Sequence, residues 1–343
     1  MPRHLVSRRA LMAIAASVTL GMASVAANAD DPVSFADETV NIVLFAGPGA
    51  PPDIWYRTLA PYLQRHLPGN PDINFINKPG AGSMISANYT AQALDPDGLS
   101  VGTMNAVAMD RAARGDSSAR FDLRDMRIIG ANQLTRVMPV NLDGIETIDD
   151  LINSENEVII GMESDATPYF EAFFGLTGIN ARIISSYQRF PQTLQAFRTG
   201  EVDAMPMSNI EWQTFGPSLA EEGAAAIWQM GYLNADGEVV GVEIPPVPTG
   251  HDVVRQVNPD AVGGEAWNVM TIAAAGQSIS NEVWAPPGTP DAYVDAWRDA
   301  FVAATSDPEF IATHLESYGI EPSWTNGAQA REVVDQILAL YGQ

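Results

Sequence analysis

The 343-residue sequence predicts an α/β protein whose parallel sheet is covered by helices. Short apolar runs typical of strands alternate with segments in which apolar residues recur at helical spacing. This alternation extends from residue 40 to residue 141 and begins again at Thr147. Two glycine-rich turns, residues 46–53 and 78–83, each follow an apolar run and precede a helical segment. A sheet with helical crossovers explains all of these observations.

The first half of the alternation predicts strands at 40–45, 73–76, 99–104 and 127–131, with helices at 52–66, 83–93 and 104–113. The second half predicts helices at 147–151, 167–177 and 190–199, with strands at 157–162, 181–185 and 202–205.

The last third of the chain is less regular. Residues 241–250 include three prolines, which indicates an irregular connection. A strand is expected at 283–285. Residues 286–290, rich in proline and glycine, are expected to end this strand and to cap a helix at 291–305. The amphipathic tail at 328–340 predicts a final helix.

Residues 1–29 have the pattern of an export signal. Arg3, Arg8 and Arg9 precede an apolar stretch at 10–27, and cleavage is expected after Ala29. The alternative is an uncleaved membrane anchor, but Ala, Ser and Thr dominate the stretch and make it a weak membrane span. The paired arginines leave a twin-arginine signal open beside an ordinary one. Because the chain has no cysteine, it has no disulfide and no lipid anchor on cysteine, and we expect a free periplasmic protein.

The charge balance excludes some partners. The chain has 42 acidic and 18 basic residues, for a net charge of −24, and three of the basic residues lie in the export signal. Such a chain is not expected to bind nucleic acid or an anionic membrane surface. Its single lysine, Lys78, opens the second glycine turn.

The two glycine turns predict a binding site for a small carboxylate. Gly49, Gly80 and Gly82 allow backbone conformations in which N–H groups point outward, and a following helix start favours an anion. Each turn taken alone also fits a plain tight turn.

Motifs along the chain resemble those of the substrate-binding proteins of tripartite tricarboxylate transporters, the Bug family. The first turn of that family reads Pro-Gly-Gly-x-x-Asp-Ile-x-x-Arg, and this chain has Pro48, Gly49, Asp53, Ile54 and Arg57, with Ala50 in place of the second glycine. The second turn, Asn-Arg-Pro-Gly-Ala-Gly-Gly in the family, is here residues 77–83, with a lysine and a final serine as departures. Residues 96–100, 200–203, 247–249 and 285–290 continue the resemblance over nearly the whole chain after the export signal.

The resemblance implies a type II periplasmic binding protein, with two α/β lobes joined by a hinge and a ligand cleft between them. Lobe I would comprise residues 30–140 and 283–343, and lobe II residues 141–282, with chain crossings near 139–141 and 281–285. It also implies a monomer without cofactor or metal. Such a protein captures a small organic carboxylate (a di- or tricarboxylate or an aromatic acid) and delivers it to the large and small membrane subunits of the transporter.

Candidate ligand-binding residues follow from the turns and the resemblance. In lobe I they are Gly47, Pro48, Gly49, Ala50, Asp53, Gly80, Ala81, Gly82, Ser83, Thr103 and Asn105. In lobe II they are Ser164, Asp165, Thr167, Tyr187, Arg189, Ser208 and Asn209.

Several of these residues have a second interpretation. Asp53 and Arg57 are four apart and fit a helix-surface ion pair, while Asp53 at a helix start also fits a cap or a water ligand. Arg189 fits either a carboxylate clamp or a solvated surface residue. Trp55, Tyr169, Phe190 and Trp212 fit core packing better than an aromatic pocket. Where many family members have an aspartate that suits amine-bearing ligands, residues 205–209 contain no acid, which disfavours amino-acid ligands.

Two other functions stay open. An exported hydrolase is disfavoured because the chain has no His-Glu-x-x-His or Gly-x-Ser-x-Gly motif, and His66, His251 and His314 are isolated, although a pair of carboxylates is not excluded. A binding protein that feeds a sensor kinase would have the same sequence features. We therefore expect a non-enzymatic binding protein.

Overall fold

A six-stranded sheet carries the N-terminal glycine turns. The computed structural model describes residues 33–162, 167–187, 190–234, 236–243 and 245–342; the expected export signal lies outside them. The strand order is β13-β4-β12-β3-β1-β2. These strands are β1 (Thr39–Leu44), β2 (Asp72–Asn77), β3 (Ser100–Asn105), β4 (Arg127–Asn132), β12 (Asn281–Ala285) and β13 (Trp324–Asn326). Strands β1, β2 and β3 are parallel, whereas β12 runs antiparallel to β3 and β4.

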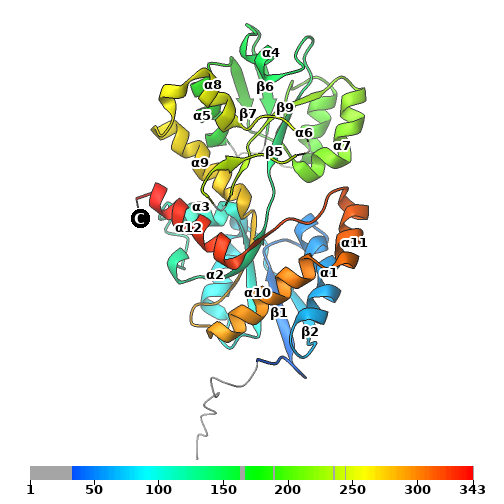
Figure 1. The fold of residues 1–343 in the computed structure, drawn as a ribbon, viewed down its shortest axis with the longest axis vertical. Coiled ribbons are helices and arrows are strands. Elements are labelled where there is room, and N and C mark those ends of the chain that lie inside the picture. The colour runs from blue at the N-terminus through cyan, green and yellow to red at the C-terminus, as the bar shows by residue number, and fades with distance from the viewer. Residues whose placement is uncertain (1–32, 163–166, 188–189, 235, 244, 343) are drawn as a thin grey trace, which may run out of the picture. The chain divides into compact units, whose positions relative to one another are not determined.

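Helices cover both faces of this sheet (Figure 1). On one face pack α1 (Pro51–His66), α10 (Asp291–Thr305) and α11 (Pro308–Tyr318). On the other pack α2 (Met84–Ala93), α3 (Ala106–Ala113) and α12 (Gly327–Leu340). Short 3₁₀ turns precede α2 and β4, η1 (Ala81–Ser83) and η2 (Leu123–Asp125). Each helix packs apolar side chains against the sheet, so both faces of the sheet are buried.

A second group of strands forms the other core. In it β5 (Arg136–Val140) pairs with β8 (Met207–Ser208) and β9 (Ala225–Gln229), and β6 (Val158–Gly161) pairs with β7 (Ala181–Ile184). Ala204 connects the two pairings through single bridges to Val140 and Ile160. Around them lie α4 (Ile148–Ile152), α5 (Thr167–Thr177), α6 (Phe190–Arg198), α7 (Asn209–Glu221) and α8 (Gly250–Val257). Trp228 stacks on Phe173 with ring centroids 4.1 Å apart and centres this core.

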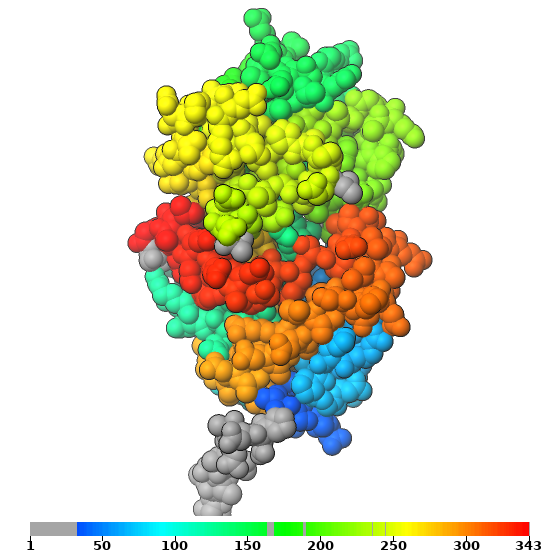
Figure 2. Space-filling model, in the orientation of Figure 1, coloured from blue at the N-terminus to red at the C-terminus, as the bar shows by residue number. Residues whose placement is uncertain are grey.

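Helix α9 (Glu265–Ser278) and a hairpin connect the two cores. The hairpin comprises β10 (Tyr232–Leu233) and β11 (Val239–Val240), and the 3₁₀ turn η3 (Pro259–Ala261) precedes α9. Leu233 and Val239 pack into the same core as Ile337 of α12. Figure 2 shows the red C-terminal helix directly beneath the yellow-green segment that carries this hairpin. The hairpin is therefore a further contact between the two α/β parts, in addition to the two chain crossings.

The predicted α/β class and two-lobed fold are confirmed, but the sheet is not purely parallel, because β12 and β13 run antiparallel to their neighbours. The helix limits at α5 and α10 are the predicted ones. The strand expected at 202–205 is wrong, since only the bridges of Ala204 form there. Strands β5, β8, β9, β10, β11 and β13 and helices α7, α8, α9 and α11 were not predicted.

The chain leaves the six-stranded sheet earlier than expected. Strand β4 ends at Asn132, and β5 already pairs with β8 and β9, so the first crossing lies between Asn132 and Arg136 rather than near 139–141. The return enters β12 at Asn281, as the sequence indicates. The division of the chain into residues 30–140, 141–282 and 283–343 stays a prediction, except that residues 136–140 pair with the second group of strands. No helix of the described residues has the length and apolar character needed to cross a membrane.

Candidate ligand-binding site

Hydrogen bonds hold the two glycine turns together. The side-chain amide of Asn77, at the end of β2, donates to the carbonyl of Ala46 and to Asp53 Oδ1, both at 2.8 Å. Asp53 is 2 % exposed and also accepts from Gly49 N–H at 2.8 Å and from Arg57 Nε at 3.0 Å. The hydrogen bond from Arg57 is the main reason that the pKa of Asp53 falls to about 2. The carboxylate of Asp53 thus holds the two turns together, and both of its oxygens already accept hydrogen bonds from Gly49, Arg57 and Asn77.

The second glycine turn has an unusual backbone. Residues 80–83 all have positive φ, with Ala81 at 52° and Ser83 at 68°. Positive φ is costly for residues other than glycine, so the surroundings must hold this conformation. Arg111 donates to the carbonyl of Ala81 at 3.2 Å, and Ser83 Oγ donates to Asn105 Oδ1 at 2.7 Å. The turn is therefore tied to helix α3 and to the end of β3.

Thr103 and Asn105 act as connectors on β3. The hydroxyl of Thr103, fully buried, donates to the carbonyl of Val43 and accepts from Phe45 N–H, both at 3.0 Å. Asn105 Oδ1 caps α3 by accepting from Ala108 N–H at 3.3 Å. These bonds place the ends of β1 and β3 side by side, at the edge where ligands of open α/β sheets bind.

Three asparagines line up at this edge. Asn281, at the start of β12, pairs in register with Asn105 of β3 on one side and with Asn132 of β4 on the other. Residues directly opposite in adjacent strands point to the same face of a sheet. The Oδ1 atom of Asn132 is buried and has no hydrogen-bond partner in the described part of the chain. We call Asn105, Asn281 and Asn132 the asparagine row.

Two cavities meet at the asparagine row. Cavity A, about 430 Å³, extends toward α3 and α9 and includes Asn105 and Asn281 in its wall. Cavity B, about 490 Å³, extends toward α1 and α7 and includes Asn132 and Asn281. Four residues belong to both walls: Leu134, Arg136, Ser208 and Asn281. The boundary between the cavities is thus the first chain crossing, where both α/β parts contribute side chains.

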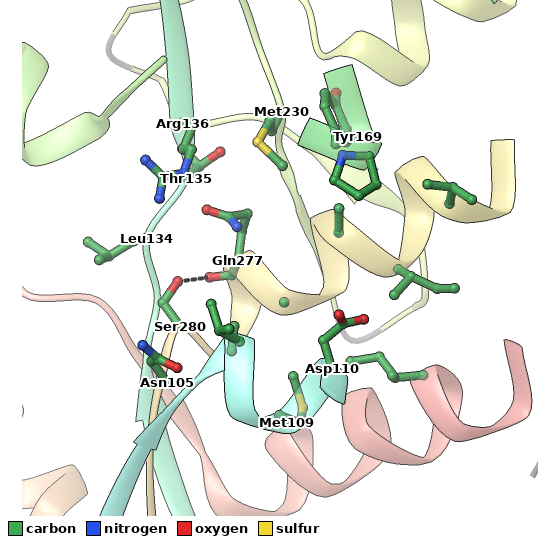
Figure 3. A pocket seen from close by; sticks show the side chains of 18 of the residues that line it. Asn105, Met109, Asp110, Leu134, Thr135, Arg136, Tyr169, Met230, Gln277 and Ser280 are labelled. Carbon is green, nitrogen blue, oxygen red and sulfur yellow. Dashed lines mark hydrogen bonds between the residues drawn. The ribbon is translucent and has the colours of Figure 1, made fainter. Parts of the chain in front are cut away.

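Arg136 is the cation at this boundary. It is the first residue of β5 and is half-buried. Of the arginines that the structure describes, only Arg136 and the exposed Arg120 have no carboxylate oxygen within 4.0 Å. Burying a charge is costly unless it is paired, so a guanidinium that lines a cavity and has no acidic partner among the described residues can bind an anion. Figure 3 shows Arg136 on β5, with the amide of Gln277 extending toward the same strand.

Several helices begin on these walls. Pro51 of α1 and Phe190 of α6 line cavity B, while Ala106 of α3 and Pro168 of α5 line cavity A. Ser208, the N-cap of α7, lines both. Each helix start carries partial positive charge, so the dipoles add to the charge of Arg136. The local field thereby opposes the negative charge of the whole protein.

Apart from Asn105, the candidate residues predicted for lobe I do not line the two cavities. Residues 47–50 and 80–83 lie next to wall residues Pro51 and Asn105 but are not themselves on the described walls. Lys78, which opens the second turn, places its ammonium 4.3 Å from the ring centroid of Tyr89 on α2, in a cation–π contact.

Among the candidate residues predicted for lobe II that the structure describes, only Ser208 lies on the cavity walls. Its hydroxyl is engaged in a capping box with Glu211, at 2.9 Å. Asn209 Oδ1 accepts from Thr135 N–H at 3.2 Å and anchors α7 to the crossing. Tyr187 donates to Glu201 at 2.8 Å. Ser164, Asp165 and Arg189 lie outside the described residues, as does the side chain of Thr167.

Sequence reasoning missed Arg136, Gln277, Asn132 and Asn281. The signal for Arg136 was present, because it is a lone charge in an otherwise apolar strand of an acidic chain. The asparagines carry no such signal, since their alignment depends on the register of strands far apart in sequence. Of the four aromatic residues considered from the sequence, Trp55 and Phe190 line cavity B and Tyr169 lines cavity A.

Comparisons with known proteins agree with this architecture. No family model matches the chain. It is similar to a UPF0065 protein of Bordetella pertussis, with 25% identity over 344 residues, 94% of this chain and 92% of that protein. Among solved structures, a TctC solute-binding protein from Polaromonas matches with a TM-score of 0.66 and 17% identity, over 90% of this chain and 98% of that one.

Two further structures share the fold. The periplasmic binding protein BugD matches with a TM-score of 0.56 and 19% identity, over 88% of this chain and 95% of that one. MatC of Rhodopseudomonas palustris, solved with bound malate, matches with a TM-score of 0.57 and 16% identity, over 88% and 97%. The chain therefore has the fold of the TctC and Bug solute-binding proteins and a sequence similar to a UPF0065 protein, which confirms the resemblance that its glycine turns predict.

Proposed function

We propose that the protein is a solute-binding protein that holds the carboxylate of a small organic acid on Arg136, above the asparagine row. The observation that carries this proposal is the half-buried guanidinium of Arg136, which lines both cavities and has no acidic partner among the described residues. A guanidinium presents two parallel N–H donors that match the geometry of a carboxylate. The malate bound to MatC, which shares the fold, supports the same class of ligand.

The asparagine row supplies neutral donors beside this cation. The amides of Asn105, Asn281 and Asn132 stand on neighbouring strands, and each has a side-chain NH₂ group that can donate to a carboxylate or to a bridging water. The second glycine turn contacts the row through Ser83, and Thr103 holds β3 against the end of β1, from which the first turn begins. We propose that the turn residues predicted from the sequence contact the ligand in a more closed state, in which the turns approach it.

Binding without catalysis is supported by the position of the histidines. His66 contacts Asp307 on the surface, His251 is buried against Trp267, and His314 bonds to the carbonyl of Ile320. Within the described part of the chain none of the three lines cavity A or cavity B. The cavity walls thus offer donors that hold an acid, and no histidine that would transfer a proton to it.

Lobe closure is the proposed mechanism. Both cavities lie where the first crossing joins the two α/β parts, so a ligand there contacts both and favours the closed state. We propose export to the periplasm, cleavage after Ala29 and delivery of the acid to the membrane subunits of a tripartite carboxylate transporter. Delivery to a sensor kinase is the second candidate, and the gene neighbourhood distinguishes the two.

A thermal-shift screen of the purified chain tests the function. The panel contains malate, succinate, citrate, benzoate, hexanoate, glutamate and glucose at equal ionic strength. A bound ligand raises the melting temperature by mass action, and we expect a rise with one or more of the plain carboxylates and none with glucose. Glutamate is expected to be weak, because no acid stands at 205–209 to receive its ammonium group. No shift with any carboxylate would contradict the proposal.

A further inference from the structure

We propose that cavity A holds an apolar chain or ring attached to the carboxylate that Arg136 binds, so that the solute is an amphipathic monocarboxylate. This inference rests on the proposed function, because it extends the ligand from Arg136 into the cavity. It selects one chemical class among the organic acids that the carboxylate site alone would admit.

The body of cavity A is apolar. Helix α9 contributes Val269, Ile272, Ala273 and Gly276, at spacings of three, four and seven residues, so all four lie on one face of the helix. Figure 3 looks into this space between α9 and the short helix α3, from which Met109 projects. An apolar wall of this extent excludes bound water more readily than a charged one, and it favours a hydrocarbon group.

Two methionines complete the wall. Met109 and Met230 are 1% and 2% exposed, and they face the cavity from the two α/β parts. A thioether chain is flexible and polarizable, so it adapts to apolar groups of different shapes. The cavity volume of about 430 Å³ lies in the range of small-molecule sites. It is large enough for a ring or a chain of several carbons.

The far end of cavity A offers no partner for a second carboxylate. The only described cation there is Arg114, which is paired with Asp110 at 2.6 Å. Tyr341 donates to Asp110 at 2.6 Å and accepts from Arg114 at 3.0 Å. These three side chains satisfy one another. A dicarboxylate placed with one end on Arg136 would therefore bring its second charge against apolar atoms or against Asp110.

The end of cavity A that Arg136 lines is polar, as the carboxylate end of the ligand requires. Arg136, Gln277, Asn105 and Asn281 all belong to its wall, and the side-chain amide of Gln277 has no hydrogen-bond partner in the described residues. Gln277 is fixed through its backbone, because its carbonyl accepts from Leu134 N–H and from Ser280 Oγ, both at 3.0 Å. The cavity thus has one polar end and an apolar body, which is the pattern of a carboxylic acid with a hydrocarbon tail.

Titration calorimetry with two acid series tests the inference. The first series is acetate, butyrate and hexanoate with 3-phenylpropionate, and the second is succinate and adipate. On the wild-type protein, each buried methylene of the first series is expected to tighten binding about fourfold. Adipate, which has the same chain length as hexanoate but a second charge, is expected to bind at least tenfold more weakly than hexanoate.

Two variants of the wall and one control locate the tail. Ala273→Phe fills part of the cavity, and Ile272→Gln makes its wall polar without filling it; both should weaken hexanoate more than tenfold and leave acetate within about twofold. Ala220→Phe makes the same substitution at the exposed end of α7 and should change neither acid. Circular dichroism and the melting temperature establish that each variant is folded.

The outcomes separate this inference from the proposed function. Equal or tighter binding of adipate, or hexanoate binding that neither wall variant weakens, would overturn the apolar-tail proposal while leaving a carboxylate-binding protein. If no acid of either series binds the wild-type protein, the proposed function itself fails. Growth of affinity with chain length that disappears in Ala273→Phe and Ile272→Gln supports both.

Discussion

Asn77 donates a hydrogen bond of 2.8 Å to Asp53 Oδ1, and this bond joins the second glycine turn to the first. The two residues are 24 positions apart, on a strand end and a helix start. Gly49 and Arg57 use the same carboxylate, so one buried side chain fixes the backbone of both turns. Asp53 therefore shapes the site without lining cavity A or cavity B.

The first prediction concerns Asp53. Asp53→Asn keeps the shape of the side chain but weakens its charge-assisted bonds to Gly49 and Arg57, so we expect a loss of about 1–3 kcal/mol in the free energy of unfolding. Urea unfolding at pH 7 measures it. Asp295→Asn is the matched control, because Asp295 is 62% exposed and its pair with Arg298 should contribute less than about 1 kcal/mol. Equal losses in the two variants would contradict the supporting role of Asp53.

The pH dependence of this contribution has a definite sign. The pKa of Asp53 is lowered from 3.8 to about 2, chiefly by the hydrogen bond from Arg57. A lowered pKa means that the folded state prefers the charged form, so the stabilisation is present above pH 4 and is lost as the pH falls toward 2. The difference between wild type and Asp53→Asn should therefore shrink on acidification below pH 4.

The second prediction concerns Glu282, whose side chain is fully buried on β12. Neither carboxyl oxygen has a hydrogen-bond partner in the described residues, and desolvation raises the pKa of Glu282 to about 8, although Arg331 opposes the rise. Because the folded state binds this proton more tightly than the unfolded chain, the contribution of Glu282 to the free energy of unfolding should fall as the pH rises from about 5 to 8, by roughly 1.4 kcal/mol per unit.

Glu282→Gln tests this directly. The amide is isosteric and neutral at every pH, so the variant should lose the slope between pH 5 and 8 and be more stable than the wild type at pH 8. Unfolding in urea at pH 5, 6.5 and 8 measures it, with Glu155→Gln in an exposed loop as control. A wild-type curve parallel to that of Glu282→Gln over this range would contradict the burial of a protonated carboxyl group.

The third prediction concerns His251, which is fully buried on α8. Its ring lies 4.5 Å from that of Trp267, and Nε2 is 3.1 Å from Thr271 Oγ1. Burial, helped by the nearby Arg255, lowers the pKa of His251 from 6.5 to about 4. On acidification the unfolded chain therefore protonates His251 before the folded protein does, and the contribution of His251 to the free energy of unfolding should fall as the pH drops from about 6.5 to 4.

Replacing His251 by Phe should remove this part of the acid sensitivity, whatever its cost in stability at pH 7. Guanidine unfolding at pH 7, 5.5 and 4.5, followed by tryptophan fluorescence, measures the slope. His66→Gln is the control, because His66 is a surface residue beside Asp307. Should His251→Phe keep the full wild-type slope while His66→Gln loses it, the assignment to the buried ring would be wrong.

The sequence predicts those parts of the fold in which local signals agree with tertiary structure. Helices α5 and α10 combine a clear apolar stripe with turn residues at their ends, and their limits agree with the predicted ones. Helix α9 was missed because it packs against both cores and is apolar on most sides, so it has no clear helical period. Strand β5 contains Pro139, which argues against a central strand, yet the chain bulges there and keeps its pairing.

The candidate site was predicted only in part for a related reason. The glycine turns are contiguous in sequence and carry their own signal, so their position at the sheet edge could be inferred. The asparagine row and cavity A depend on strand register and on the position of α9, which join residues such as Asn105 and Asn281 from distant segments. No local pattern marks such residues before the fold is known.

The most direct measurement of the central claim is calorimetric binding of the best carboxylate from the thermal-shift screen to Arg136→Gln and to Arg120→Gln. Both variants remove an arginine that has no acidic partner in the described structure, but only Arg136 lines the cavities. We predict that Arg136→Gln weakens binding by roughly 30-fold or more, the loss expected for a charged hydrogen-bonded contact, while Arg120→Gln stays within about twofold. Unchanged affinity in Arg136→Gln, in a folded protein, would contradict the assignment of Arg136 as the carboxylate-binding residue.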